Sequence, residues 1–452
     1  MLVKINIENF KSFDNATELT MISSNKIRKN ANHRLKIKST QLLKYGVVYG
    51  ANASGKTNLV EFFRFFKECV QVGMPMEAVQ MFCKNREENQ DRESSFEIQI
   101  TVGDKFYAYG FSAILSKRKI TAEWLYELYQ NGTARCLFER EGNKRPILND
   151  CITLSNGEKN KFETYADDFE GNETTLFLTE MNRGKKYTSR SKLLFFRDVF
   201  NWIQHHISVI TPNTPLVDLE YYYDNDSLYL INKLIETFDT GISQVKIEEI
   251  TLDELANAMP KPVFEKVMSH VKNKIMEQEN PFFRMTMKSN ESFFNIEVEG
   301  HNEPRITTIR LNHNRSFYDF GFEEESDGTR RLFDLMDMLL NKRDDILYVV
   351  DELERSLHPK LTAHFLELFM ELHKEDRMQL LFTTHESSIM DQSIFRRDEI
   401  WFVERGAENA STIYSLDRFK ERYDKVLSKA YLEGRYGAIP VFSSFHFREE
   451  ES

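Results

Sequence analysis

A glycine-rich segment followed by lysine and threonine is the first feature of this sequence that suggests a ligand site. It fits G-x-x-x-x-G-K-[ST] at every fixed position, and Gly50 and Gly55 give the backbone the freedom to turn its N–H groups toward phosphate oxygens. Lys56 would lie on the β and γ phosphates, and the Thr57 hydroxyl would ligate Mg²⁺. The pattern predicts a nucleotide site formed by Gly50, Ala51, Asn52, Ala53, Ser54, Gly55, Lys56, Thr57 and Asn58.

Two adjacent carboxylates follow an apolar run near the other end of the chain. Residues 345–350 predict a buried strand that ends in Asp351 and Glu352. In a phosphate-loop enzyme, a carboxylate at this position holds Mg²⁺ through its waters, which is the role predicted for Asp351. Glu352 would act as the general base that polarises the attacking water. An acidic turn after a core strand is common by itself, and the upstream phosphate loop favours the functional interpretation.

A histidine follows a second apolar run. Residues 378–384 predict another buried strand, and His385 comes directly after it. A polar side chain at the end of a strand beside the Asp351 strand can reach the γ-phosphate, so we expect His385 to hydrogen-bond it. A lone histidine is more often structural, but this position favours a catalytic role.

A serine and a glycine precede a third apolar run, residues 332–340, which predicts a helix. At the start of a helix, the Ser326 hydroxyl and the N–H of Gly328 can bind an anion. Simple capping of the helix is the alternative interpretation.

The predicted elements place the phosphate loop between a strand, residues 41–49, and a helix, residues 59–70. Turns at 103–104 and 131–132 separate alternating segments that predict an antiparallel sheet. These segments are 95–100, 106–115, 124–130 and 135–139.

The middle of the chain predicts helices. Residues 193–210 have helical character, and 218–278 show helical periodicity broken at Gly241 and at two prolines. Two strands, 282–288 and 292–299, would follow. We therefore expect a mainly helical insertion between two halves of one α/β domain, with ranges 1–190, 190–305 and 305–452.

Composition restricts the compartment and the partners. The 452 residues carry 60 Lys and Arg against 71 Asp and Glu, a net charge of −11, which disfavours nucleic-acid binding over the whole surface but allows a local basic groove. Residues 2–8 alternate like a strand rather than a signal peptide, and no apolar run approaches the ~20 residues that cross a bilayer. The four cysteines contain no C-x-x-C pair. We expect a cytoplasmic protein with no membrane partner.

A basic run shortly before the phosphate loop has three open interpretations. It could contact the nucleotide, form an edge that contacts DNA, or be a solvated loop. Its cations are Lys26, Arg28, Lys29, Arg34, Lys36 and Lys38.

Together these elements resemble the ABC-type ATPase heads of the SMC, Rad50 and RecF group. Residues 5–13 are similar to that group's first strand and turn, and the resemblance covers roughly 1–130 and 305–405. It implies a P-loop NTPase with a mixed central sheet, ATP and Mg²⁺ as cofactors, Glu352 as hydrolytic base and His385 as switch histidine. Such heads close as head-to-tail dimers around two ATP molecules. The signature that contacts the second subunit's ATP would be Ser326, Asp327, Gly328 and Thr329.

Departures from the transporter pattern indicate a bacterial branch of this group. Residues 353–359 resemble the D-loop of OLD and AAA-15/AAA-21 ATPases, and residues 431–440 are similar to the ending of the AAA-15 family, which includes the AbiL, RloA and PARIS types. The segment between the phosphate loop and the signature is too short for a Rad50-like arm and has no sustained heptads, so we expect no long coiled coil. Gln71 and Gln99 are both candidates for the Q-loop glutamine.

The resemblance implies a Mg-dependent ATPase that works as a molecular switch in phage defence or abortive infection. It would form a homodimer or a higher even-numbered oligomer and control a separately encoded effector, with a Toprim-like nuclease as one candidate. The alternative is a RecF-like repair ATPase that clamps DNA, although DNA is not the favoured partner. A purely structural oligomer is disfavoured because Lys56, Thr57, Asp351, Glu352 and His385 are all present.

Overall fold

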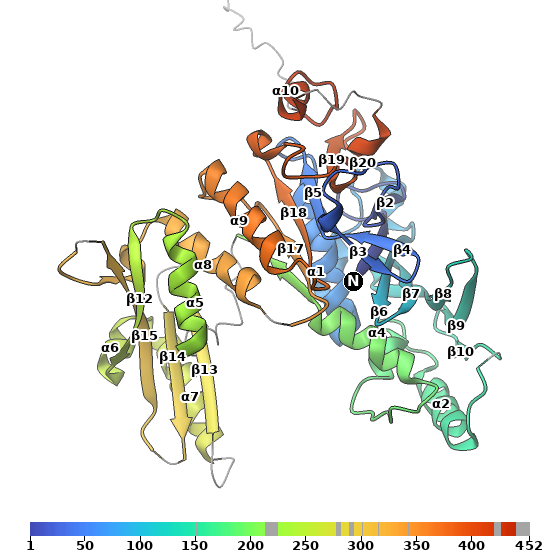
Figure 1. The fold of residues 1–452 in the computed structure, drawn as a ribbon. Helices are drawn as coiled ribbons and strands as arrows, with labels where there is room; N and C mark the ends of the chain where they lie inside the picture. The colour runs from blue at the N-terminus through green and yellow to red at the C-terminus, as the bar shows by residue number, and fades with distance from the viewer. Residues whose placement is uncertain are drawn as a thin grey trace, which may run out of the picture. The chain divides into compact units, whose positions relative to one another are not determined.

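The computed structural model describes most of the chain, which divides into two compact units (Figure 1). Unit 1 comprises Met1–Thr211, Arg343–Leu353 and His373–Ser452, and unit 2 comprises Pro212–Lys342 and Glu354–Leu372. These units divide the chain differently from the three predicted ranges, because two helices downstream of residue 305 group with the insertion. The described residues are 1–150, 152–212, 225–276 (backbone only at 225–227), 282–288 (backbone only at 286 and 288), 293–300, 302–314, 316–341, 343–419 and 426–439.

A six-stranded sheet forms the centre of unit 1, with strand order β11-β17-β18-β5-β19-β20. All neighbouring pairs are parallel except β19 and β20, which form an antiparallel pair at the edge. Strands β5, β17 and β18 are buried throughout, as expected for parallel strands covered on both faces. Their carboxyl ends therefore meet at one edge of the sheet. The strands are β5 (Tyr45–Tyr49), β11 (Ile207–Ile210), β17 (Leu347–Val350), β18 (Gln379–Thr384), β19 (Ile400–Arg405) and β20 (Ser411–Ser415).

The single strand predicted over 41–49 is two strands in different sheets. β4 (Thr40–Leu43) pairs with β3 (Arg34–Ile37) in a two-stranded sheet, and β5 belongs to the central sheet. The chain changes sheet at Lys44, whose buried ammonium donates to the carbonyl oxygens of His373 and Lys374. Burial lowers the pKa of Lys44 to about 8.

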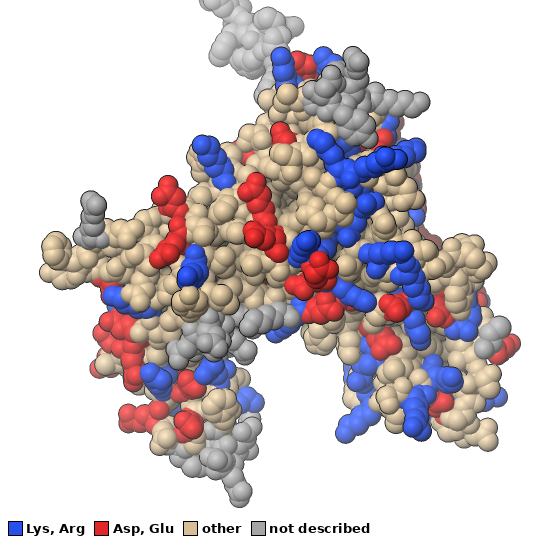
Figure 2. Space-filling view, viewed as in Figure 1, with Lys and Arg blue, Asp and Glu red and all other residues tan. Residues whose placement is uncertain are grey.

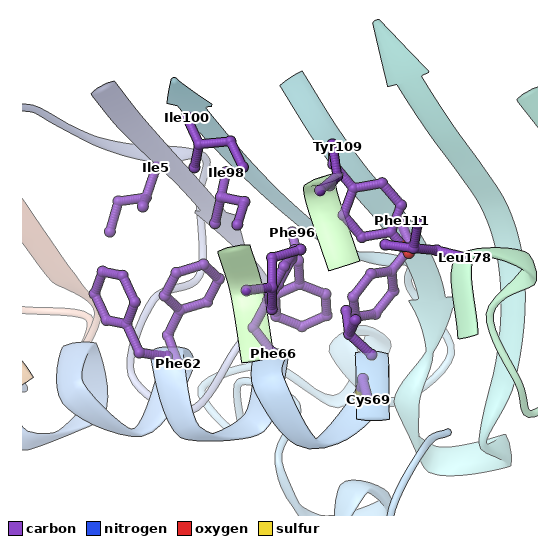
Figure 3. Packing of buried hydrophobic residues seen from close by; sticks show 14 of the residues in the cluster. Ile5, Phe62, Phe66, Cys69, Phe96, Ile98, Ile100, Tyr109, Phe111 and Leu178 are labelled. Atoms are coloured by element: carbon purple, nitrogen blue, oxygen red, sulfur yellow. The ribbon is translucent and has the colours of Figure 1, made fainter. Parts of the chain in front are cut away.

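The predicted antiparallel sheet is confirmed, with strand order β10-β9-β8-β7-β6-β1-β2. Helix α1 (Lys56–Val72) packs its phenylalanine-rich face against it, so that Phe62 and Phe66 meet Phe96 and Phe111 (Figure 3). The helix that starts at the phosphate loop is thus held by an aromatic core. The strands are β1 (Leu2–Glu8), β2 (Thr17–Thr20), β6 (Ser94–Val102), β7 (Lys105–Ile114), β8 (Lys119–Leu128), β9 (Ala134–Glu141) and β10 (Ile147–Leu148).

The helix predicted over 193–210 ends early. α4 (Leu194–His205) stops before β11, which adds to the central sheet parallel to β17. The last residues of the predicted helix, Ile207 to Ile210, are mostly β-branched and pair well in a sheet. The remaining helices of unit 1 are α2 (Asn156–Phe169), α3 (Phe177–Glu180) and α10 (Leu427–Leu432). The predicted strand over 292–299 is β14 (Phe293–Glu299), and Ser292 lies outside the described residues, as do Pro440 and the acidic tail.

Unit 2 contains a sheet as well as the predicted helices. Its strand order is β12-β15-β14-β13, and β12 (Ile242–Ile250) lies where helical periodicity was expected. Glu248 pairs with Arg310 and Glu249 with Arg305 across the strands, so charged residues interrupt the apolar alternation that would have marked this strand. The other elements are α5 (Asn225–Glu236), α6 (Leu252–Asn257), α7 (Lys261–Met276), β13 (Phe282–Lys288), β15 (Arg305–His313), β16 (Phe320–Gly321), α8 (Asp327–Leu340) and α9 (Pro359–Leu372).

Helix lengths agree with the expected absence of a long coiled coil. Within the described ranges the longest helix is α1, with 17 residues. In the same part of the chain, no helix has both the length and the apolar character that crossing a membrane requires.

Candidate functional site

The segment between β5 and α1 lines a cavity of about 460 Å³ in unit 1. Glu352 follows β17, His385 follows β18, and both side chains line the same cavity. The structure therefore brings the phosphate loop together with the two predicted catalytic residues. Gly50 and Ala51 of the predicted loop do not line it. The lining residues are Asn52, Ala53, Ser54, Gly55, Lys56, Thr57, Asn58, Glu352, His385 and Arg405.

The two glycines of the loop are required for different reasons. Gly55 precedes α1 with a φ of 110°, a left-handed conformation that disfavours any side chain. Gly50 has no positive φ, but a Cβ there would overlap the carbonyl oxygen of Val403. The backbone freedom expected at both glycines is thus found at Gly55, whereas Gly50 is a position of close approach to β19.

Lys56 lies inside the curve of the loop. Its Nζ donates to the carbonyl oxygens of Gly50 at 2.8 Å and Ala51 at 3.0 Å. The same atom is 3.3 Å from Nδ1 of His385, and the residue is only 5% exposed. The ammonium is therefore held beside the histidine predicted to bind the γ-phosphate.

Thr383, the residue before the end of β18, connects the two carboxylates. Its hydroxyl donates to Oδ1 of Asp351 at 2.6 Å and accepts the backbone N–H of Glu352 at 2.9 Å. Asp351 is buried, and Glu352 has a φ of 49°, a conformation that costs a residue with a side chain about 1 kcal/mol or more. Oε1 of Glu352 lies 3.8 Å from Nε2 of His385. The pairing across β17 and β18 thus orients the predicted base.

Arg405 completes the cavity and was missed by the sequence analysis. It is the last residue of β19, and its Nε donates to the carbonyl oxygen of Asn409 in the turn to β20. An arginine at the end of a strand belongs to no known motif, so only its position in the folded sheet could have identified it.

Two further serines hold the phosphate loop in place. Ser411 in β20 donates through its hydroxyl to the carbonyl oxygen of Ser54 at 2.5 Å. Its backbone N–H donates to the carbonyl oxygen of Ser12, and the Ser12 hydroxyl accepts the side-chain amide of Asn58. The loop is therefore fixed between the turn after β1 and the β19–β20 hairpin.

The predicted signature residues lie in unit 2 and are not among those that line this cavity. Ser326 is the N-cap of α8, and its Oγ accepts the N–H of Thr329 at 3.1 Å. Asp327 forms an ion pair with Arg330. Gly328 lies against the backbone of Ser356, where a Cβ would be 2.6 Å from the carbonyl oxygen. The capping interpretation of Ser326 therefore holds, and a signature role remains a prediction.

Other residues singled out from the sequence lie elsewhere. Neither Gln71 nor Gln99 lines the cavity, and none of the six cations of the 26–38 run does. The loop that carries the first of these cations is held by the buried Arg396, which donates to the carbonyl oxygens of Ile27 and Lys29. This cavity gives no support to a nucleotide contact by the basic run, and the other two interpretations stay open.

The family of the chain follows from a match over residues 47–391, more than half of its length. The matching family model is AAA_21, described as "AAA domain, putative AbiEii toxin, Type IV TA system". The chain belongs to the AAA_21 family. The AAA_21 match spans the phosphate loop, both carboxylates and His385, so this chain is a nucleotide-binding ATPase of that family. The predicted AAA-21 resemblance is thereby confirmed.

No curated protein matches the AAA_21 chain, whereas several solved SMC head domains do. An SMC head bound to the C-winged helix domain of ScpA is 12% identical, with coverage of 92% of this chain and 97% of that chain and a TM-score of 0.38. The SMC head domain from Thermotoga maritima has 12% identity, 92% and 98% coverage and a TM-score of 0.36. An Smc head derived from Pyrococcus furiosus, with an extended coiled coil and bound to the C-terminal domain of ScpA, has 12% identity, 96% and 98% coverage and a TM-score of 0.33. The fold described here rests on the strand order of the chain itself.

Proposed function

We propose that this AAA_21 chain is a molecular switch that binds and hydrolyses ATP within a head-to-tail dimer. The observation that carries the proposal is the convergence of Lys56, Glu352 and His385 on one cavity behind a phosphate loop. Metal-assisted phosphoryl transfer to water needs a lysine that binds the phosphates, a carboxylate that binds the water and a polar group such as a histidine beside both.

Each residue of the proposed site has a separate role in ATP hydrolysis. Lys56 stabilises the negative charge of the β and γ phosphates, and the loop N–H groups add donors at the start of α1. Glu352 orients the attacking water and accepts its proton, while His385 hydrogen-bonds the γ-phosphate. Thr383 keeps Glu352 in its strained conformation.

Two residues offer the oxygen ligands that Mg²⁺ prefers. The carboxylate of Asp351 is oriented by the Thr383 hydroxyl, and Thr57 lines the cavity with its own hydroxyl. Mg²⁺ held there would supply further positive charge to the β and γ phosphates. Asp351 is buried and does not itself line the cavity, so the fit rests on the oxygen chemistry of these two residues, and on that basis the proposal includes Mg²⁺ dependence.

A second copy of the chain would complete the site. Ser326 at the N-terminus of α8 offers a hydroxyl at the positive end of a 14-residue helix, a favourable place for a phosphate. In a head-to-tail dimer, Ser326, Asp327, Gly328 and Thr329 of one protomer would contact the ATP bound by the other.

We propose further that the switch serves bacterial defence against phage by abortive infection, as in the AbiL, RloA and PARIS types, and works in the cytoplasm. The AbiEii toxin description of the family supports this role. The ATPase would control a separately encoded nuclease or toxin. The alternative is a RecF-like ATPase that clamps DNA during repair.

Replacing the proposed base tests the ATPase cycle. Glu352→Gln should lower phosphate release by 100-fold or more, the usual order for loss of a general base, while ATP binding is retained. Light scattering should then find a species of twice the protomer mass in ATP and a monomer in ADP. Glu367→Gln, on the exposed face of α9, is the matched control and should behave as the parent protein. A Glu352→Gln protein that stays monomeric in saturating ATP would remove the dimer from the proposal.

A pulldown with the product of the neighbouring gene distinguishes the two biological roles. A stable complex with a nuclease-like protein supports the effector role. Tight duplex-DNA binding that depends on ATP, without a protein partner, supports the DNA clamp.

A further inference from the structure

A second hollow in unit 1 is larger than the nucleotide cavity. It measures about 690 Å³ and lies between strands β7 to β9 and the start of α4. A cavity of about 420 Å³ shares Arg190 and Ser191 with it, so the segment 186–193 runs between the two. We refer to both cavities together as the α4 groove.

The segment that divides the α4 groove lies within a strongly basic stretch of the chain. This stretch, residues 181–197, contains six cations and no aspartate or glutamate, in a chain whose net charge is −11. Figure 2 shows Lys and Arg side chains gathered over this part of unit 1, around α2 and α4 at the lower right. The six cations are Arg183, Lys185, Lys186, Arg190, Lys192 and Arg197.

Some of these cations build the segment, and others are available to a ligand. Lys185 pairs with Glu180, and Arg197 donates to Oδ1 of Asn182, which ties the segment to α3 and α4. Four exposed cations of the groove form no close ion pair with a carboxylate in the described part of the chain, although Lys105 acts on Asp198 at longer range. They are Lys105, Lys186, Arg190 and Lys192.

The carboxylates of the groove do not cancel this charge. Glu127 accepts from the guanidinium of Arg135, and Glu158 stays ionised, but the lining residues carry only three carboxylates against six Lys and Arg. Asp198 is half-buried, and burial raises the pKa of its carboxyl while the nearby Lys105 lowers it. The potential of the groove is therefore positive, a requirement for binding a polyanion.

The groove walls suit phosphates better than a peptide. Proteins grip nucleic acid without sequence preference through Lys and Arg together with hydroxyl groups that contact phosphate oxygens. A peptide site would offer apolar anchors, but no groove residue is among the exposed large hydrophobic residues of the described chain. The serines and threonines of the groove are Thr153, Ser155, Thr188, Ser189 and Ser191.

We infer that the α4 groove binds the phosphodiester backbone of single-stranded nucleic acid. The hollows are too small to admit a double helix but can take the phosphates of one strand. This binding is independent of the nucleotide site, which shares no lining residue with the groove. It therefore goes beyond the proposed switch and does not rest on it.

Anisotropy of a fluorescent oligothymidylate of about 20 nucleotides tests the inference in the absence of ATP. The double charge reversal Arg190→Glu with Lys192→Glu should weaken binding tenfold or more. Lys266→Glu with Lys272→Glu, on the exposed face of α7, makes the same change in net charge and should leave binding unchanged. The variant Arg190→Ala with Lys192→Ala removes the two cations without reversing their charge and should also bind more weakly. Thermal melts of both variants show whether they remain folded.

The salt dependence gives a second readout. If four cations each hold a phosphate, the log–log slope of affinity against salt is about −3, equivalent to a loss of roughly 50-fold between about 50 and 200 mM salt. Removing two cations should make the slope shallower by about 1.4.

Several results would overturn the inference. The first is no binding of the oligonucleotide at low salt, and the second is an equal loss of affinity in the groove and α7 variants. The third is displacement of the strand by polyglutamate as readily as by unlabelled oligonucleotide. The fourth is a higher affinity for free ADP or blunt duplex than for the single strand. Binding of a fluorescent ATP analogue, measured in the same variants, should not change, so failure of the groove and failure of the switch are distinguishable.

Discussion

At the residue scale, Thr383 makes a contact with both carboxylates of the proposed site. Thr383→Val keeps the shape of the side chain but leaves Oδ1 of Asp351 without its donor and the N–H of Glu352 without its acceptor. We expect kcat to fall by about 10- to 100-fold with little change in ATP affinity, because the base is misplaced while the phosphate loop is intact. Steady-state phosphate release and binding of an ATP analogue measure the two quantities.

Thr362→Val is the matched control. Thr362 is buried in α9, and its hydroxyl has no hydrogen-bond partner among the described residues, so this variant should be as active as the parent and at least as stable. Equal loss of activity in both variants would show that the hydroxyl of Thr383 has no special role.

Only some residues of the proposed site could be predicted from the sequence. Lys56, Glu352 and His385 were predicted because each follows a recognisable strand or motif, and the structure places them around one cavity. Thr383 and Arg405 were not predicted, because their roles come from pairing between strands whose partners are distant in sequence. Tertiary contacts of this kind leave no local pattern.

At the element scale, the close approach of β19 to the phosphate loop makes a prediction about Gly50. Gly50→Ala would push the loop away from Val403, so ATP affinity should fall tenfold or more and stability by about 1–3 kcal/mol. Gly157→Ala in α2 is the contrasting control, since a Cβ there has no neighbour within 4 Å in the described part of the chain and should stabilise by roughly 0.5–1 kcal/mol. Thermal melts and titration with an ATP analogue measure both. An unchanged Gly50→Ala protein would contradict the steric argument.

The N-terminus of α2 predicts an acid-sensitive contact. Hydrogen bonds from the Ser191 and Ser155 hydroxyls lower the pKa of Glu158 to about 2, below its ordinary value of 4.5. Because the folded pKa is depressed, the stabilisation is present above about pH 4.5 and is lost as the pH falls toward 2. The difference in Tm between the parent and Glu158→Gln should therefore be largest near neutral pH and vanish toward pH 2. A difference that is constant across this range would contradict the assignment.

Helices and strands were predicted well where the packing environment is the same along the whole segment. α1 and strands β1, β6, β7 and β9 of the antiparallel sheet have uniform periodicity, and each was located to within a few residues, whereas the short edge strands β2 and β10 were not predicted. The predictions differ from the structure where the environment changes within a segment, as at Lys44, where the chain leaves one sheet for another, and at His206, where α4 gives way to β11. The sequence did not predict β12, because the charged residues of its cross-strand ion pairs interrupt the apolar alternation.

At the scale of the whole molecule, unit 1 is assembled from segments at both ends of the chain. The phosphate loop comes from the first segment, Glu352 from the short Arg343–Leu353 segment and His385 from the last. The insertion between them supplies α8 with the predicted signature. One protomer therefore carries both halves of the proposed composite ATP site, one in each unit.

The central claim is that each ATP site combines the phosphate loop of one protomer with the signature of another. It can be tested with two inactive variants. Glu352→Gln removes the base from its own site, and Ser326→Asp keeps the cap of α8 but places a negative charge where the partner's γ-phosphate would bind. In a mixture of equal parts, half of the dimers contain one of each, and such a dimer has one intact site of two.

Phosphate release by this mixture is the decisive measurement. If the sites are composite, the mixture recovers about a quarter of the parent activity, although each variant alone is inactive. If the mixture is as inactive as its components at saturating ATP and protein, the two units do not complete each other across a dimer and the account is contradicted.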